Sequence, residues 1–297
     1  EGSLSFVFLA FLCVHLPLLL GTPTGRLACV LIALTLALLT MMAEAISTRG
    51  TDNFVIPVGG YFLLEILLDL SSESLAWRLG ALVLLLVLVT VARRWSTLQG
   101  SALLGAALLG YGCYALGDWR FVLPPAGLFL SHLVTTHRLG IVGHLEHGMD
   151  AIGSLSISAF PWLLAKAAGL IDPEVALLAF AGSFATHLAI MHCSTATWSG
   201  KRHPGCRGGV VKGCALGLAP VALVVALTDN PVDSPAHLAI ALLLATAPIL
   251  LATTAYNRCR ARFGQQGDPL WTIEAGLALA ASLGVFGILH LLAPASP

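Results

Sequence analysis

A dense polar segment follows one of the most apolar stretches of this sequence. The run "LACVLIALTLALLT" leads into "MMAEAISTRGTDNFVIPVGG", which carries Glu44, Arg49, Asp52 and Asn53 within ten residues. Carboxylate oxygens at such a turn suit Mg²⁺, which takes one or two carboxylates together with substrate phosphates. We therefore interpret Glu44 and Asp52 as candidate metal ligands, and Arg49 as a candidate partner for phosphate.

A structural alternative for the same segment is a polar turn over residues 47–54 between two helices. Gly50 would allow the chain to reverse, and Asp52 or Asn53 would cap the second helix. Glu44 lies about one turn before the end of the first helix, where an acid in a bilayer costs free energy. We expect its side chain to face the helix bundle and to pair with a basic residue of the turn or with a bound cation.

The order of these residues resembles the C-terminal part of the CTP-dependent polyprenol kinase family, which includes phytol kinase and dolichol kinase-like proteins. Members carry a Glu, a short polar turn and Asp-Asn before a "VPL"-like helix start, and the matching residues here are Glu44, Asp52, Asn53 and Pro57. The family also has a Lys-(Ser/Thr)-x-Glu-Gly-Ser motif upstream, and this chain begins "EGSLSFVFLAF". The resemblance covers roughly residues 1–70.

This resemblance implies a membrane-bound lipid-alcohol kinase that transfers phosphate from CTP or another nucleotide to a prenol, phytol or dolichol-like alcohol, with Mg²⁺ as the metal. The residues that it implies for catalysis are Glu44, Asp52 and Asn53, with Asp52 and Glu44 also holding the metal, and those for the nucleotide are Glu1, Gly2, Ser3 and Arg49. The family's Gly-Asp-x-x-Ala segment and the Lys of the motif would precede Glu1. We therefore expect residues 1–70 to be the end of a kinase module, incomplete as an enzyme by itself.

A second candidate site is the loop "HRLGIVGHLEHGMD", in which His144, His147 and Asp150 recur every three residues. Imidazole suits several transition metals. However, steps of three drift around a helix and no His-Glu-x-x-His motif is present, so we favour a polar loop with interfacial histidines. His187 and His192, five residues apart, are interpreted as helix-end residues.

The segment "WSGKRHPGCRGGVVKG" is strongly basic. Its residues 201–212 could bind anionic lipid head groups. Each basic residue near such a surface contributes about 1 kcal/mol of binding free energy. The alternative is that these charges only set the orientation of the neighbouring helices.

Composition defines the class of protein. Of 297 residues 57% are hydrophobic and only 10% are charged, and the mean hydropathy is +0.89, whereas soluble domains carry about 25% charged residues. No β-type alternation is visible, so we expect an all-α, polytopic transmembrane bundle rather than a barrel. The expected location is a bacterial inner membrane and the expected partner a membrane lipid or prenyl alcohol. A net charge of zero gives no indication of nucleic-acid binding.

Eleven segments approach the roughly 20 apolar residues that a membrane span needs. They are 4–20, 27–46, 55–69, 75–92, 101–116, 119–135, 151–170, 174–193, 209–227, 236–256 and 270–293. Two are short, and residues 101–135 could form a tight hairpin turning at "LGDWR", so the range is ten to eleven. Residues 71–297 are accordingly predicted to be a second membrane domain of about eight helices with no assigned function.

The distribution of Lys and Arg predicts the orientation, because cytoplasmic loops are enriched in both. With the N-terminus in the cytoplasm, eleven of the basic residues fall on the cytoplasmic side and four on the opposite side. We therefore predict a cytoplasmic N-terminus and an outside C-terminus.

A rival function is a transporter or lipid flippase, because helices interrupted by Gly and Pro are typical of carriers. Few acids lie within the predicted spans, namely Glu44, Glu65 and Glu274, and a proton-coupled carrier usually needs more. A non-catalytic membrane fragment is a third possibility.

Overall fold

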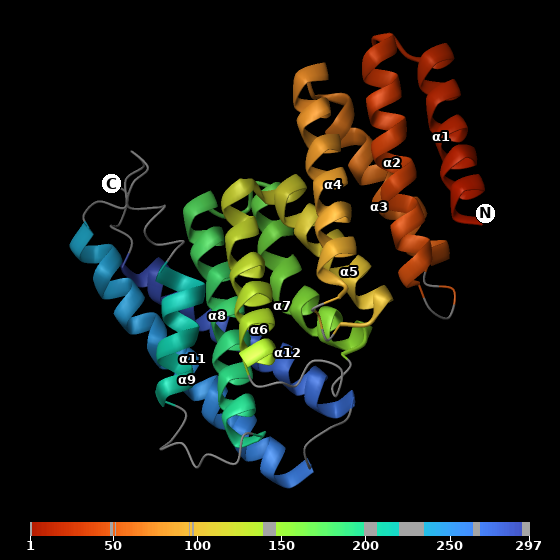
Figure 1. The fold of residues 1–297 in the computed structure, drawn as a ribbon. Coiled ribbons are helices and arrows are strands. Elements are labelled where there is room, and N and C mark those ends of the chain that lie inside the picture. The colour runs from red at the N-terminus through yellow and green to blue at the C-terminus, as the bar shows by residue number, and fades with distance from the viewer. Residues whose placement is uncertain are drawn as a thin grey trace, which may run out of the picture. The chain divides into compact units, whose positions relative to one another are not determined.

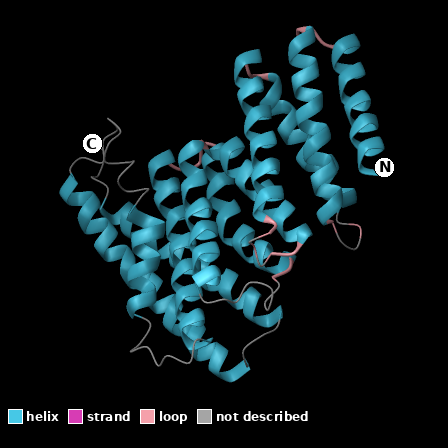
Figure 2. Cartoon of the chain, in the orientation of Figure 1, coloured by secondary structure: helices cyan, strands magenta, loops and turns pink. Residues whose placement is uncertain are grey.

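The computed structural model describes residues 2–47, 50, 52–94, 96, 98–138, 147–198, 207–219, 235–263 and 268–292. Within these residues the chain consists of helices joined by turns, with one isolated bridge between Leu98 and His147 and no β-strand (Figure 2). The prediction of an all-α protein is therefore confirmed.

Over the residues that the structure describes, the eleven apolar segments coincide largely with helical structure (Figure 1), and the segment 209–227 is described only as far as residue 219. The α-helices are α1 (Gly2–Gly21), α2 (Arg26–Ile46), α3 (Asp52–Leu68), α4 (Ser72–Ala92), α5 (Gly100–Gly112), α6 (Leu123–Arg138), α7 (Met149–Ala167), α8 (Pro173–Trp198), α9 (Arg207–Gly213), α11 (Pro235–Phe263) and α12 (Asp268–Leu292). Six helical segments of the described chain are long and apolar enough to cross a membrane. They indicate a membrane protein, whereas the number of eleven spans stays a prediction.

The chain divides into two compact units, which are described separately below. The first comprises Glu1–Tyr111 with His147–Met149, and the second comprises Gly112–Glu146 with Asp150–Pro297. Helix α4 and most of α5 belong to the first unit, whereas the sequence boundary at residue 70 assigned them to the second domain. That boundary followed the kinase resemblance rather than packing, and the domain assignment based on it stays a prediction.

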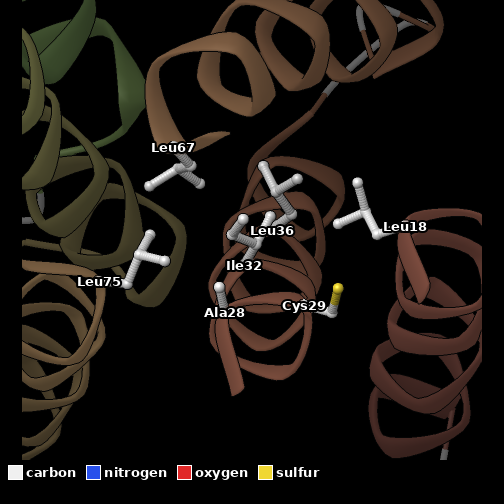
Figure 3. Packing of buried hydrophobic residues seen from close by; sticks show 7 residues of the cluster. All are labelled: Leu18, Ala28, Cys29, Ile32, Leu36, Leu67 and Leu75. Atoms are coloured by element: carbon white, nitrogen blue, oxygen red, sulfur yellow. The ribbon is translucent and has the colours of Figure 1, made fainter. Parts of the chain in front are cut away.

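In the first unit, α2 is the central helix and packs against α1, α3 and α4. Figure 3 shows the apolar cluster that joins them, which consists of Leu18, Ala28, Cys29, Ile32, Leu36, Leu67 and Leu75. Cys29, Ile32 and Leu36 recur at intervals of three and four residues, so they lie on the same side of α2. The connection between α1 and α2 is short, and the two helices pack along each other in opposite directions (Figure 1).

In the second unit, α8 is the central helix. Every residue of α8 from Ala176 to Ile190 is buried, and α6, α9, α11 and α12 all pack against the helix. A helix that is largely apolar on all sides belongs in the interior of a bundle, and α8 occupies this place in the second unit.

The closest helix contact in this unit involves glycines that recur every four residues. Helix α9 continues into a π-helical turn, η3 (Cys214–Leu218), and Gly213 and Gly217 of this segment face Ala185 and Ala189 of α8. A Cβ atom on Gly217 would lie 2.7 Å from the Cα atom of Ala185. Small residues at such spacing let two helix backbones approach closely in lipid.

The expected turn at "LGDWR" is confirmed. Helix α5 is followed by a π-helical turn, η1 (Cys113–Gly117), then by Asp118 in extended conformation and a 3₁₀ turn, η2 (Trp119–Val122), which leads into α6. The carboxylate of Asp118 accepts a hydrogen bond from the backbone N–H of Arg120 at 2.8 Å, so it caps η2.

Candidate functional site

The residues predicted for the kinase-like site occupy helix ends of the first unit. Glu44 lies in the last turn of α2 with an exposed side chain, whereas we expected it to turn into the helix bundle. Asp52 is half-buried at the start of α3, and Asn53 beside it is exposed. Because α1 and α2 are antiparallel and α3 follows α2 after a short turn, Gly2, Glu44 and Asp52 lie at the same end of this unit.

The turn before α3 has the geometry that its residue types predict. Gly50 has a φ of +78°, a left-handed conformation that glycine adopts without steric cost. The backbone N–H of Asn53 donates to the carbonyl of Gly50 at 3.3 Å, which closes the turn. Asp52 places a carboxylate in the first turn of α3, where the helix dipole favours negative charge.

Several predicted residues lie outside the described part of the chain. These are Glu1, Arg49, His144, the basic residues at 201 and 202, and the side chain of Ser3. The described portion of the His-rich loop contains His147, whose carbonyl accepts a hydrogen bond from the backbone of Gln99 at 3.0 Å. Among the described residues no three His, Cys, Asp or Glu side chains gather as metal ligands.

The second unit contains a polar cluster that the sequence did not predict. His187 of α8 is only 2% exposed, its Nδ1 atom lies 2.8 Å from Oε1 of Glu274 on α12, and its Nε2 atom lies 3.0 Å from Oγ of Ser158 on α7. We call Ser158, His187 and Glu274 the interior triad. An ionisable side chain within a membrane bundle is costly unless it is paired, and this triad provides the pairing.

Hydrogen bonds and ring contacts hold the helices around the interior triad. One turn after Ser158, the indole of Trp162 donates to Oγ of Ser282 on α12 at 2.9 Å, and its ring lies 5.4 Å from that of Phe286. The ring of Phe184 lies 6.5 Å from that of His187 on the same helix. These contacts connect α7 to α12 and thereby fix the position of Ser158 relative to the histidine.

The interpretation of His187 as a helix-end residue is wrong. At about 1.5 Å of rise per residue it lies about 20 Å from Pro173, in the middle of α8. His192 lies nearer the end of α8, where its Nε2 atom is 3.1 Å from Oγ of Ser131 on α6. The available signal was a histidine in one apolar segment and a lone acid, Glu274, in another, because each needs a partner in lipid.

A second polar cluster lies at one end of the second unit. Arg120 forms ion pairs with Asp118 at 2.8 Å and with Glu174, in the first turn of α8, at 2.6 Å. Lys166, in the last turn of α7, donates to the carbonyls of Leu116 and Gly117. Burial opposes ionisation of Asp118, but the hydrogen bonds and charge of Arg120 outweigh it and hold the pKa of that carboxyl below its ordinary value. This cluster ties η2 to α8.

Comparison with known proteins gives no match for this chain among protein-family models, curated proteins or solved structures. The kinase resemblance therefore depends on the residues of the N-terminal segment alone, and the interior triad depends on the geometry alone.

Proposed function

We propose that the chain is a multi-pass membrane protein whose first unit contains the C-terminal part of a lipid-alcohol kinase. Its substrate is a prenol, phytol or dolichol-like alcohol, and CTP is the phosphate donor. One observation carries the proposal: Gly2, Glu44 and Asp52, whose order resembles the polyprenol kinases, come together at one end of α1, α2 and α3.

The roles of these residues follow from the demands of phosphoryl transfer, which depends on positioning and on neutralisation of charge. The exposed carboxylate of Glu44 and the half-buried one of Asp52 are accessible to water, which suits Mg²⁺ because this ion keeps several waters when it binds one or two carboxylates. When bound there, Mg²⁺ would neutralise the phosphate charge. The positive end of the helix dipole at the start of α3 and the absence of a side chain at Gly2 favour close approach of a phosphate.

The lipid alcohol fits the flank of α3. Phe54, Val55, Val58 and Phe62 are exposed on this helix, beginning within one turn of Asp52. An isoprenoid chain in the bilayer could lie along these side chains while its hydroxyl reaches the polar end of the helix. This arrangement explains why the reaction would be carried out by a membrane protein.

The proposal includes an orientation. CTP is a cytosolic donor, so the end that carries Asp52 would face the cytoplasm, in agreement with the excess of Lys and Arg assigned to that side. With eleven spans the C-terminus would then lie outside, in a bacterial inner membrane.

The test is transfer of labelled phosphate from CTP to phytol or another prenyl alcohol, in membranes that contain the protein as its gene encodes it, with any residues upstream of Glu1. Asp52→Asn should reduce transfer about 100-fold or more, because a neutral amide cannot replace a carboxylate that holds Mg²⁺ against phosphate. Activity should follow the carboxylate, so Asp52→Glu should retain more of it than Asp52→Asn.

The matched control is Asp69→Asn, which removes a carboxylate just beyond the opposite end of the same helix. This variant and His147→Ala should change transfer little. Full activity of Asp52→Asn, together with loss of activity in His147→Ala, would mean that the His-rich loop rather than the start of α3 carries the chemistry.

A further inference from the structure

The hydroxyl of Ser158 lies between two acceptors. Its Oγ atom is 3.0 Å from Nε2 of His187 and 3.0 Å from the carbonyl oxygen of Leu155, one turn earlier on α7. A serine hydroxyl donates one hydrogen bond and accepts others, and its proton rotates to suit its surroundings. Ser158 can therefore serve His187 either as a donor or as an acceptor without moving any heavy atom.

The interior triad consequently satisfies its hydrogen bonds in two protonation states. In the neutral state, His187 donates from Nδ1 to Glu274 and accepts at Nε2 from Ser158. In the protonated state, Nε2 carries a second proton and donates to Ser158, whose own proton turns to the carbonyl of Leu155. A buried polar group without a partner costs about 1–3 kcal/mol, and neither state leaves one in the triad.

We propose that Ser158, His187 and Glu274 form a proton-binding site in the apolar interior of the second unit. Its ligand is a single proton, of the kind whose binding drives movement in helical membrane proteins that use buried His and acidic residues as relays. The site is separate from the kinase residues of the first unit and does not depend on them.

Charge supports the same conclusion. Glu274 is 8% exposed, and its carboxylate lies beside His187 at 2.8 Å, so a proton on the imidazole forms a neutral ion pair instead of an isolated charge. On α11, Tyr256 interacts electrostatically with both Glu274 and Arg260. Helix α7 contributes the uncharged Ser158 to the triad.

Another ionisable side chain near α8 lies towards the end of that helix and interacts with His192 instead of His187. Lys212 of α9 interacts electrostatically with His192, which pairs with Ser131 of α6. The group that bears directly on the proton at His187 is therefore the carboxylate of Glu274, which in turn interacts with Tyr256.

The order serine, histidine, acid also occurs in enzymes with a nucleophilic serine. Here Ser158 and His187 are 0% and 2% exposed, so a carbonyl substrate has no approach to Oγ. A proton requires no such space, because it can pass along the hydrogen bonds that connect His187 to Glu274 and Ser158. Burial thus favours a proton over a covalent substrate.

The test is a pH titration of the full chain in lipid bilayers with ¹⁵N-labelled histidine, followed by solid-state NMR, with His187→Gln assigning the signal. His187 should change reversibly from a neutral to a doubly protonated ring as the pH is lowered, as a histidine switch does. Glu274→Gln removes the opposite charge and should weaken proton binding at His187 about 10-fold or more.

Ser158→Ala and Ser154→Ala form a matched pair that does not depend on the folding of Glu274→Gln. Both serines are buried on α7, but the hydroxyl of Ser154 donates to the carbonyl of Ala151 instead of contacting His187. Ser158→Ala should weaken proton binding a few-fold, because a hydrogen bond from a cation is about twice as strong as a neutral one, and Ser154→Ala should leave it unchanged. A ring of His187 that keeps one protonation state throughout, or equal effects of the two serine variants, would overturn the proposal.

Discussion

Arg120 connects two helical elements of the second unit, η2 and α8. Its side chain is 15% exposed, and its partners Asp118 and Glu174 are 31% and 11% exposed. Arg120→Ala leaves both carboxylates without their cation, and removing one partner of a buried pair costs about 3–5 kcal/mol. Because Asp118 keeps some access to water, we expect a loss of about 2 kcal/mol in unfolding free energy, measured by thermal unfolding in lipid or detergent. Arg120→Lys should lose less, since it keeps the charge but not the planar fork.

The pH dependence of this loss in unfolding free energy distinguishes the effect of the ion pair from a general loss of packing. The folded-state pKa of Asp118 lies below its ordinary value, so its contribution is fully present above the unfolded pKa of about 3.9 and disappears as the pH falls through the folded pKa. The gap in stability between wild type and Arg120→Ala should therefore narrow below about pH 4. A gap of constant size down to acid pH would mean that Arg120 contributes through packing alone.

The residues that the sequence predicted correctly are those whose conformation depends on close neighbours. Gly50 could be assigned to a turn because a glycine and an Asp-Asn pair determine the backbone conformation of only the few residues around them. His187 could not be assigned, because its partners Ser158 and Glu274 are 29 and 87 residues away in sequence. No periodicity encodes such a pairing, and only the packing of α7, α8 and α12 reveals it.

At the scale of elements, the contact between α8 and the segment formed by α9 and η3 requires the absence of side chains. Gly217→Ala would place a Cβ atom within 2.7 Å of the Ala185 backbone, and neither helix can yield without moving other contacts. Overpacking of this kind costs about 1–3 kcal/mol, so we expect the variant to unfold at a clearly lower temperature than wild type, measured in lipid nanodiscs.

Gly276→Ala in α12 provides the matched control for this prediction. A Cβ atom there meets nothing within 4 Å, and alanine favours a helix over glycine by about 1 kcal/mol, so this variant should be neutral or slightly more stable. Equal stability of the two variants would show that α9 and α8 do not pack as closely as the glycines indicate.

Most helices were predictable because they coincide with apolar runs, and several begin at a polar residue or proline, as α3 does at Asp52 and α8 at Pro173. The two π-helical turns could not be predicted from the sequence. Both η1 and η3 lie within apolar sequence that carries no signal of a change in helix type. Packing rather than local sequence thus determines where the helical hydrogen-bond pattern changes.

At the scale of the whole molecule, contacts within the second unit agree with the predicted alternation of loops. The ion pair of Arg120 with Glu174 and the bonds of Lys166 join the "LGDWR" turn, the end of α7 and the start of α8, three segments that the sequence assigns to the outside. At the opposite end of α8, His192 pairs with Ser131 of α6. Successive membrane crossings require the loops to form two groups, one at each end of the helices.

This alternation leads to the prediction about orientation in the membrane. A fluorescent protein that matures only in the cytoplasm should stay dark when fused after Pro297, whereas alkaline phosphatase fused there should be active, because an odd number of spans places the two termini on opposite sides. The same pair of reporters inserted in the basic segment 199–206 should give the reverse result, since Lys and Arg are retained on the cytoplasmic side. Fluorescence at both positions would mean that the chain crosses the membrane an even number of times between residue 206 and Pro297. One of the three spans predicted there, 209–227, 236–256 or 270–293, would then not cross the membrane.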